Sequence, residues 1–118
     1  MLERLFAGLN NTDLNAVLEL FADDVLFFGT STKALGVDGA GPRSYWATLS
    51  TGKPGANVAS ALEYSVRDAG GGVQLLSGTW QIAMAGRDTK PMFRVSMAVT
   101  QRNGKWKIVQ FHNSAMPQ

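Results

Sequence analysis

Apolar residues in the first half of the chain recur at helical spacing. The stripe over residues 2–9 predicts a short amphipathic helix, and the stripe over 14–21 predicts a second helix with Thr12 as its N-cap. A short apolar run over 25–28 is typical of a buried strand, and Pro42 suits the first position of a third helix. The first half therefore predicts three helices and one strand.

The second half of the chain is typical of strands alone. Four strands are expected, over residues 57–68, 73–84, 92–102 and 105–113. Three consecutive glycines join the first two strands, and Asn103-Gly104 joins the last two as a strong hairpin signal. Helices followed by hairpins predict a single α+β domain over 1–118, with the helices packed on one face of a strongly curved antiparallel sheet.

The Asn103-Gly104 turn also sets the register of the last two strands, because a two-residue turn places Arg102 opposite Lys105. The face expected against the helices then carries Phe93, Val95, Met97, Val99, Trp106, Ile108, Gln110 and His112. The other face carries Arg94, Ser96, Ala98, Thr100, Lys107, Val109, Phe111 and Asn113. Apolar side chains on that face predict a homodimer through the sheet. A β-bulge would reverse part of this assignment.

Composition narrows the functional classes. The chain has 45 % hydrophobic residues, no cysteine, one histidine and a formal charge of +2. Its lysines and arginines are scattered, so no nucleic-acid partner is expected. It lacks the long apolar run of a membrane span or signal peptide. Without cysteine it has neither a disulfide framework nor a zinc–thiolate site, which fits a reducing compartment and predicts the cytoplasm.

No cofactor and no metal are expected. The glycine-rich loop over 36–41 precedes a helix but lacks the lysine and the strand–helix–strand context of a phosphate-binding loop. Asp23 and Asp24 are neighbours whose side chains diverge, and only one histidine could join them. We therefore expect a small organic ligand to bind to protein side chains alone.

His112 is the first candidate for chemistry, because it follows an apolar strand and its usual pKa lies close to neutrality. It could act as a general acid or base at the mouth of a pocket, with Gln110 or Asn113 polarising a carbonyl group. Arg94 could bind a carboxylate or phosphate. The alternatives are a hydrogen-bonded histidine at the sheet end and an arginine that is exposed or lies at a dimer interface.

Aromatic side chains could supply the wall of such a pocket. The candidates for ligand contact are Phe28, Tyr45, Trp46, Tyr64 and Trp80. The alternative for each is an ordinary place in the hydrophobic core.

Four strings resemble a known superfamily. Phe21-Ala-Asp-Asp-Val25 looks like the entry to the first strand of NTF2-like, also called cystatin-like or SnoaL-like, domains. Arg94-Val-Ser, Gly104-Lys-Trp-Lys-Ile-Val109 and Phe111-His-Asn-Ser-Ala-Met-Pro117 resemble the DUF4440 and SgcJ/EcaC-type branch. The last two strings are also similar to the end of the association domain of calcium/calmodulin-dependent kinase II.

The resemblance implies a cone-shaped fold with a deep pocket between helices and sheet, and commonly a homodimer through the sheet. The ketosteroid-isomerase branch carries its base aspartate at the end of the first strand, and this chain has Gly29 at that position. Fold does not fix function in such a superfamily. Three functions stay open: small-molecule binding, a cofactor-independent isomerase, hydrolase or cyclase that uses His112, and an oligomerisation domain.

Overall fold

The structure, a computed structural model, describes residues 1–49 and 52–117. Its helices and strands are α1 (Leu2–Asn10), α2 (Leu14–Leu18), β1 (Phe21–Phe28), α3 (Ala40–Leu49), β2 (Asn57–Gly70), β3 (Val73–Met84), β4 (Met92–Arg102) and β5 (Lys105–Ala115). This order confirms the prediction of helices first and hairpins afterwards. No helix among the described residues is long and apolar enough to cross a membrane.

Three helix boundaries differ from the prediction: helix α3 begins at Ala40, two residues before Pro42, and both ends of α2 are shifted. The N-cap of α2 is Asp13, whose carboxylate accepts a hydrogen bond from the Ala16 N–H at 3.1 Å, whereas Thr12 adopts a positive φ of 51°. Helix α2 also ends before Phe21, which pairs with Ile108 and so belongs to β1. Pairing with β5 gives the backbone of Phe21 hydrogen-bond partners, as a helix would. This pairing sets the end of α2 before Phe21.

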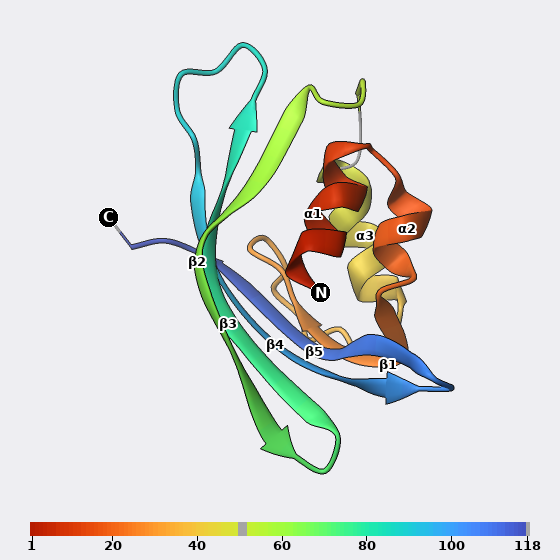
Figure 1. Ribbon diagram of the computed structural model, residues 1–118. Helices are drawn as coiled ribbons and strands as arrows, with labels where there is room; N and C mark the ends of the chain where they lie inside the picture. Colours follow the sequence, from red (N-terminus) through yellow and green to blue (C-terminus); the bar gives the residue numbers. More distant parts are fainter. Residues whose placement is uncertain (50–51, 118) are drawn as a thin grey trace.

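The five strands form one sheet in the order β1-β5-β4-β3-β2. Strands β2 to β5 are joined by antiparallel pairing, while β1 runs parallel to β5 at the edge, so the sheet is mixed rather than wholly antiparallel. Figure 1 shows the sheet strongly curved, with all three helices on its concave side. This is the predicted α+β cone.

The β4–β5 hairpin contains the feature that places the site residues. Asn103 and Gly104 both have positive φ, and Arg102 pairs with Lys105, as the turn predicts. Further along, Ala98 pairs with Gln110 while Val99 pairs with Ile108, so Val109 is an extra residue in β5. This bulge reverses the faces of every later residue in the strand.

The concave face is closed by aromatic packing. Phe27 of β1 stacks on Phe111 of β5 with ring centroids 5.2 Å apart, and Trp46 of α3 lies edge-on to Phe111 at 5.7 Å. All three side chains are buried. Phe111 occupies this core position only because the bulge turned it inward, which corrects its predicted place on the outer face.

Candidate functional site

The sequence-predicted site residues lie on both faces of the sheet. The convex outer face carries Phe28, Arg94, Gln110 and His112, and the concave side holds Tyr45, Trp46, Trp80 and Asn113. Tyr64 stands apart on the β2–β3 pair, where it faces Gly78 and is 44 % exposed. The predicted constellation is therefore divided by the sheet itself.

The prediction that Gln110 and His112 face the helices is wrong, because the bulge at Val109 turns both outward. The His112 ring lies 5.4 Å from the ring of Phe28, and Ser96 is its partner across β4. A hollow of about 330 Å³ on this face is lined by Leu75, Leu76, Ser77, Ser96, Met97, Ala98, Gln110 and His112. The role of His112 as a general acid or base stays a prediction.

Arg94 points outward, as the register predicted, but it lies opposite Ser114 rather than Asn113 because of the same bulge. It lines a neighbouring groove of about 500 Å³ together with Glu63 and Thr79. Within the described residues Arg94 forms no ion pair; the recorded salt bridge joins Arg102 to Asp24. Arg94 and Asn113 therefore lie on opposite faces of the sheet, and their role in ligand binding stays a prediction.

Asn113 lies at the centre of a buried hydrogen-bonded chain. Its side-chain oxygen accepts from the Trp80 indole N–H at 2.8 Å, and its amide nitrogen donates to the Tyr45 hydroxyl oxygen at 3.1 Å. The Tyr45 hydroxyl lies 2.7 Å from the hydroxyl of Thr30. Since an indole N–H can only donate, the orientation of the amide is determined, whereas either hydroxyl of the Thr30–Tyr45 pair can be the donor. The chain runs from the core to the surface.

Trp46 lies in the hydrophobic core, and its role as a ligand contact stays a prediction. Its side chain is fully buried among aromatic rings, with Tyr45 at 4.7 Å and Phe21 at 6.3 Å between centroids. Its indole nitrogen has no hydrogen-bond partner among the described residues. A buried, unpaired N–H costs free energy, so the packing of the surrounding rings must offset this cost.

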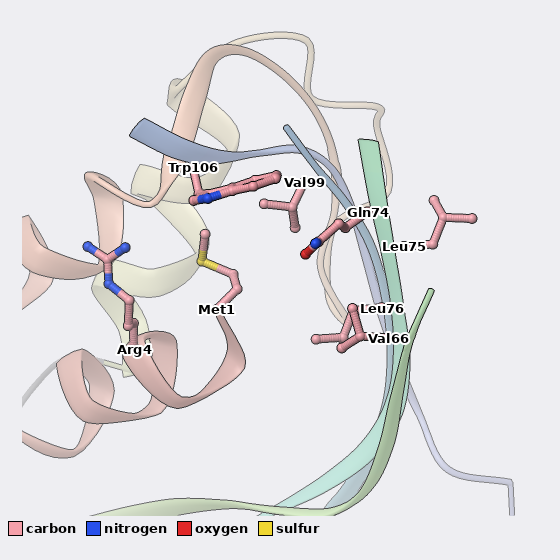
Figure 2. Close-up of a pocket in the computed structure, with 8 residues that line it drawn as sticks. All are labelled: Met1, Arg4, Val66, Gln74, Leu75, Leu76, Val99 and Trp106. Atoms are coloured by element: carbon pink, nitrogen blue, oxygen red, sulfur yellow. The ribbon is translucent and has the colours of Figure 1, made fainter. Parts of the chain in front are cut away.

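A pocket that the sequence did not reveal opens at the other end of the concave side. Figure 2 shows it between the start of α1 and the inner face of the sheet. Its volume is about 310 Å³, and its lining residues are Met1, Arg4, Val66, Gln74, Leu75, Leu76, Val99 and Trp106. We call it the α1–sheet pocket. The side chain of Leu75 points away from it, whereas those of Gln74 and Leu76 point toward α1.

Part of this pocket could have been found from the sequence. The register correctly placed Val99 and Trp106 on the face toward the helices, although Trp106 is 37 % exposed there. Arg4 lies outside the apolar stripe of α1, and no sequence pattern indicates that it lines a pocket. Only the placement of α1 against the far end of the β2–β3 pair brings these residues together.

Comparison with known families decides the membership of the chain. The sequence profile of the SnoaL-like domain matches residues 1–118, which is the entire chain. The chain belongs to the SnoaL-like domain family. No curated protein sequence matches it.

Solved structures of proteins with low sequence identity to this chain have the same fold. A candidate calcium/calmodulin-dependent protein kinase II association domain from Xanthomonas campestris is 21 % identical with a TM-score of 0.85, covering 99 % of this chain and 84 % of the other. An NTF2-like protein of unknown function from Pseudomonas putida is 17 % identical with a TM-score of 0.83, covering 99 % and 82 %. A candidate ketosteroid isomerase from Parabacteroides distasonis is 22 % identical with a TM-score of 0.71, covering 92 % and 80 %.

In ketosteroid isomerases the resemblance places a base aspartate at the position of Gly29. In this SnoaL-like chain the ring of Tyr45 occupies the space of a side chain there. A Cβ atom added to Gly29 would lie 2.3 Å from Cδ1 of Tyr45, so the tyrosine ring occupies the space of a side chain at that position. The same ring reaches Asn113 and Thr30 through its hydroxyl group. Glycine at position 29 thus supports the buried chain, and it leaves neither a carboxylate nor room for one.

The two concave ends differ in what their side chains can do. At the Asn113 end the indole, amide and phenol groups bind one another, and a ligand would have to break these hydrogen bonds. At the α1–sheet pocket, apolar side chains face open space, and the polar groups of Arg4 and Gln74 stand at its edges. The second arrangement is typical of small-molecule sites, which combine apolar walls with a few polar groups.

Proposed function

We propose that this SnoaL-like chain binds a small, mostly apolar molecule in the α1–sheet pocket. The observation that supports it is an apolar concavity of about 310 Å³ with the indole of Trp106 as one wall. This volume is near the lower end of the range of small-molecule sites, which begins at about 300 Å³.

Exposed apolar walls supply the binding energy in this proposal. Val66 is 44 % exposed and Trp106 is 37 % exposed. Covering roughly 100 Å² of wall and an equal area of ligand would contribute about 5 kcal/mol before the entropic cost of association. A net affinity weaker than micromolar is therefore expected for a simple apolar ligand.

The pocket favours binding over proton-transfer chemistry. Its eight lining residues include no carboxylate, histidine, tyrosine, serine or threonine. Arg4 is the ionisable side chain among them, and a guanidinium group stays protonated, so it is a poor general base. His112 lies across the sheet from this pocket, and the proposal gives it no part in ligand binding.

Phenylnaphthylamine, a neutral probe that fluoresces in apolar surroundings, tests the site. Val66→Phe would fill the pocket and is expected to weaken probe binding at least tenfold. Val58→Phe is a matched control, because Val58 lies on the same strand with the same 44 % exposure but does not line the pocket. Equal binding to wild type and both variants would overturn the proposal.

We also propose that two copies associate through the outer face of the sheet. Leu26 and Leu75 are exposed on this face at 43 % and 47 %, and Phe28 lies beside His112. Exposed apolar side chains on one face of a sheet favour burial against a partner. The similarity to a candidate kinase association domain supports self-association as a property to test.

Light scattering during size-exclusion chromatography measures this association. Leu75→Lys is expected to shift a wild-type dimer to a monomer, because it buries a charge in the interface. Leu35→Lys is the control, since Leu35 is similarly exposed at 51 % but lies in the loop before α3. A monomeric wild type at high micromolar concentration would contradict self-association.

A further inference from the structure

We infer that the ligand of the α1–sheet pocket is a small organic acid, with an apolar body inside the pocket and its anionic group at Arg4. This inference rests on the proposed function, because it concerns the same site. It adds the charge and the orientation of the ligand, which an apolar cavity alone does not specify.

The polar groups of the pocket stand on opposite sides of an apolar centre. Figure 2 shows the guanidinium group of Arg4 on the helix side, next to Met1 and Trp106, and the amide of Gln74 on the sheet side. Val66, Leu76 and Val99 complete the walls between them. A ligand that fills this space therefore has an apolar middle and can place a polar group at the Arg4 side.

Among the described residues, no carboxylate lies within salt-bridge distance of the Arg4 guanidinium group. Arg4 therefore forms no ion pair within the described residues, and it is exposed. Asp13 and Glu19 line a separate hollow on its other flank, and neither approaches it within salt-bridge distance. Asp68 pairs with Gln74 across the sheet, but its carboxylate accepts a hydrogen bond from the Gly70 N–H at 2.8 Å.

Helix α1 adds to the positive potential at this edge. Arg4 lies in its first turn, and the N-cap residue Met1 makes no side-chain capping hydrogen bond. Free N–H groups at a helix start favour anions, although Glu3 in the same turn offsets part of this effect. A guanidinium group can bind both oxygens of a carboxylate or sulfonate at once, so an acid fits this edge better than a neutral polar group.

Two matched probes separate charge from apolar contact. Anilinonaphthalene sulfonate and phenylnaphthylamine share one aromatic framework and differ by the sulfonate group. Wild type is expected to bind the sulfonate about two- to fivefold more tightly, which is the range for an exposed charge pair. Raising the salt concentration should reduce this preference, because the interacting charges are accessible to solvent.

Arg4→Gln is expected to weaken sulfonate binding more than phenylnaphthylamine binding and so to remove the preference for the sulfonate. Arg4→Lys should keep part of the preference, and Arg43→Gln, an exposed arginine on α3, should keep all of it. Binding of the neutral probe by the variant also shows that the variant is folded. Competition by decanoate but not by decanol would extend the result to carboxylic acids.

The outcomes distinguish the inference from the function on which it rests. If Val66→Phe weakens neither probe, the proposed pocket fails and the inference fails with it. If Val66→Phe weakens both probes but Arg4→Gln leaves their ratio unchanged, the pocket stands and the acidic ligand is overturned. If Arg4→Gln weakens both probes equally, Arg4 shapes the pocket without recognising charge, and the inference is again overturned.

Discussion

The two ends of the concave side use similar residues for different purposes. At one end Trp80, Asn113 and Tyr45 are buried and joined by hydrogen bonds, and at the other end Trp106 and Val66 are exposed around a pocket. Buried polar groups stabilise a fold when they are paired, whereas exposed apolar walls can be covered by a ligand. The filled end therefore contributes to stability, and the open end is the proposed binding site.

The two ends also differ in whether the family resemblance points to them. The resemblance directs attention to the end of β1, where Gly29 and Tyr45 pack against each other. The pocket lies instead beside Arg4 and Trp106. If both assignments are correct, changes at the filled end alter stability without altering specificity, and changes at the open end do the reverse.

The largest expected effect comes from deleting Val109. The bulge keeps Ile108 and Trp106 inward while it also turns Phe111 and Asn113 inward, so its loss would force one of these sets outward. We expect destabilisation of more than about 4 kcal/mol, measured by urea unfolding or as a failure to fold. Val109→Ala keeps the backbone length and should cost only about 1 kcal/mol. A stable deletion variant would show that the bulge is dispensable.

Asn113→Leu should cause the next largest loss. It leaves the Trp80 N–H without an acceptor and the Tyr45 hydroxyl without its amide donor in a buried site. The expected cost is about 2 to 4 kcal/mol in the free energy of unfolding. Ser114→Ala is the neighbouring control and should be nearly neutral. Probe binding in the α1–sheet pocket should persist; its loss in a folded variant would mean that the two ends are coupled.

Gly29→Ala tests the close packing at the filled end. The added Cβ would lie 2.3 Å from the Tyr45 ring, so the ring must move and strain its hydrogen bonds. We expect a cost of about 2 kcal/mol, measured by thermal and urea unfolding. Gly39→Ala is the control, because no atom lies within 4 Å of the new Cβ atom. Equal stability of the two variants would refute the packing role of Gly29.

His112→Ala should have the smallest effect. The ring is exposed on the outer face, where its recorded aromatic contact is Phe28. We expect a stability change within about 0.5 kcal/mol and no change in probe affinity, because the pocket lies across the sheet. A large loss of probe binding in this variant would return His112 to the ligand site and break the distinction between the two faces.

The sequence predicted most of the fold because its signals are local. The apolar stripe of α1 and the Asn103-Gly104 turn depend on residues close together in the chain, and both are confirmed. Local signals of this kind, read along the chain, predict the order of helices and strands from α1 to β5. Likewise, Val99 and Trp106 lie on the predicted face because they precede any irregularity in the hairpin.

The site could not be predicted to the same extent, because one extra residue changes which side chains meet. Before Val109 the alternation holds, and after it Gln110 and His112 exchange faces with Phe111 and Asn113. Nothing local distinguishes Val109 from its neighbours. The choice depends on burying Phe111 against Phe27 and pairing Asn113 with Trp80, residues that are distant in the sequence.

The sequence by itself determined the helices, the strands, the hairpin turn and the family. Only the tertiary structure decided that His112 lies on the outer face, that Tyr45 fills the space beside Gly29, and that Arg4 and Trp106 line one pocket. Periodicity and turn chemistry are properties of short segments, whereas a bulge or a pocket depends on the packing of segments far apart in the chain.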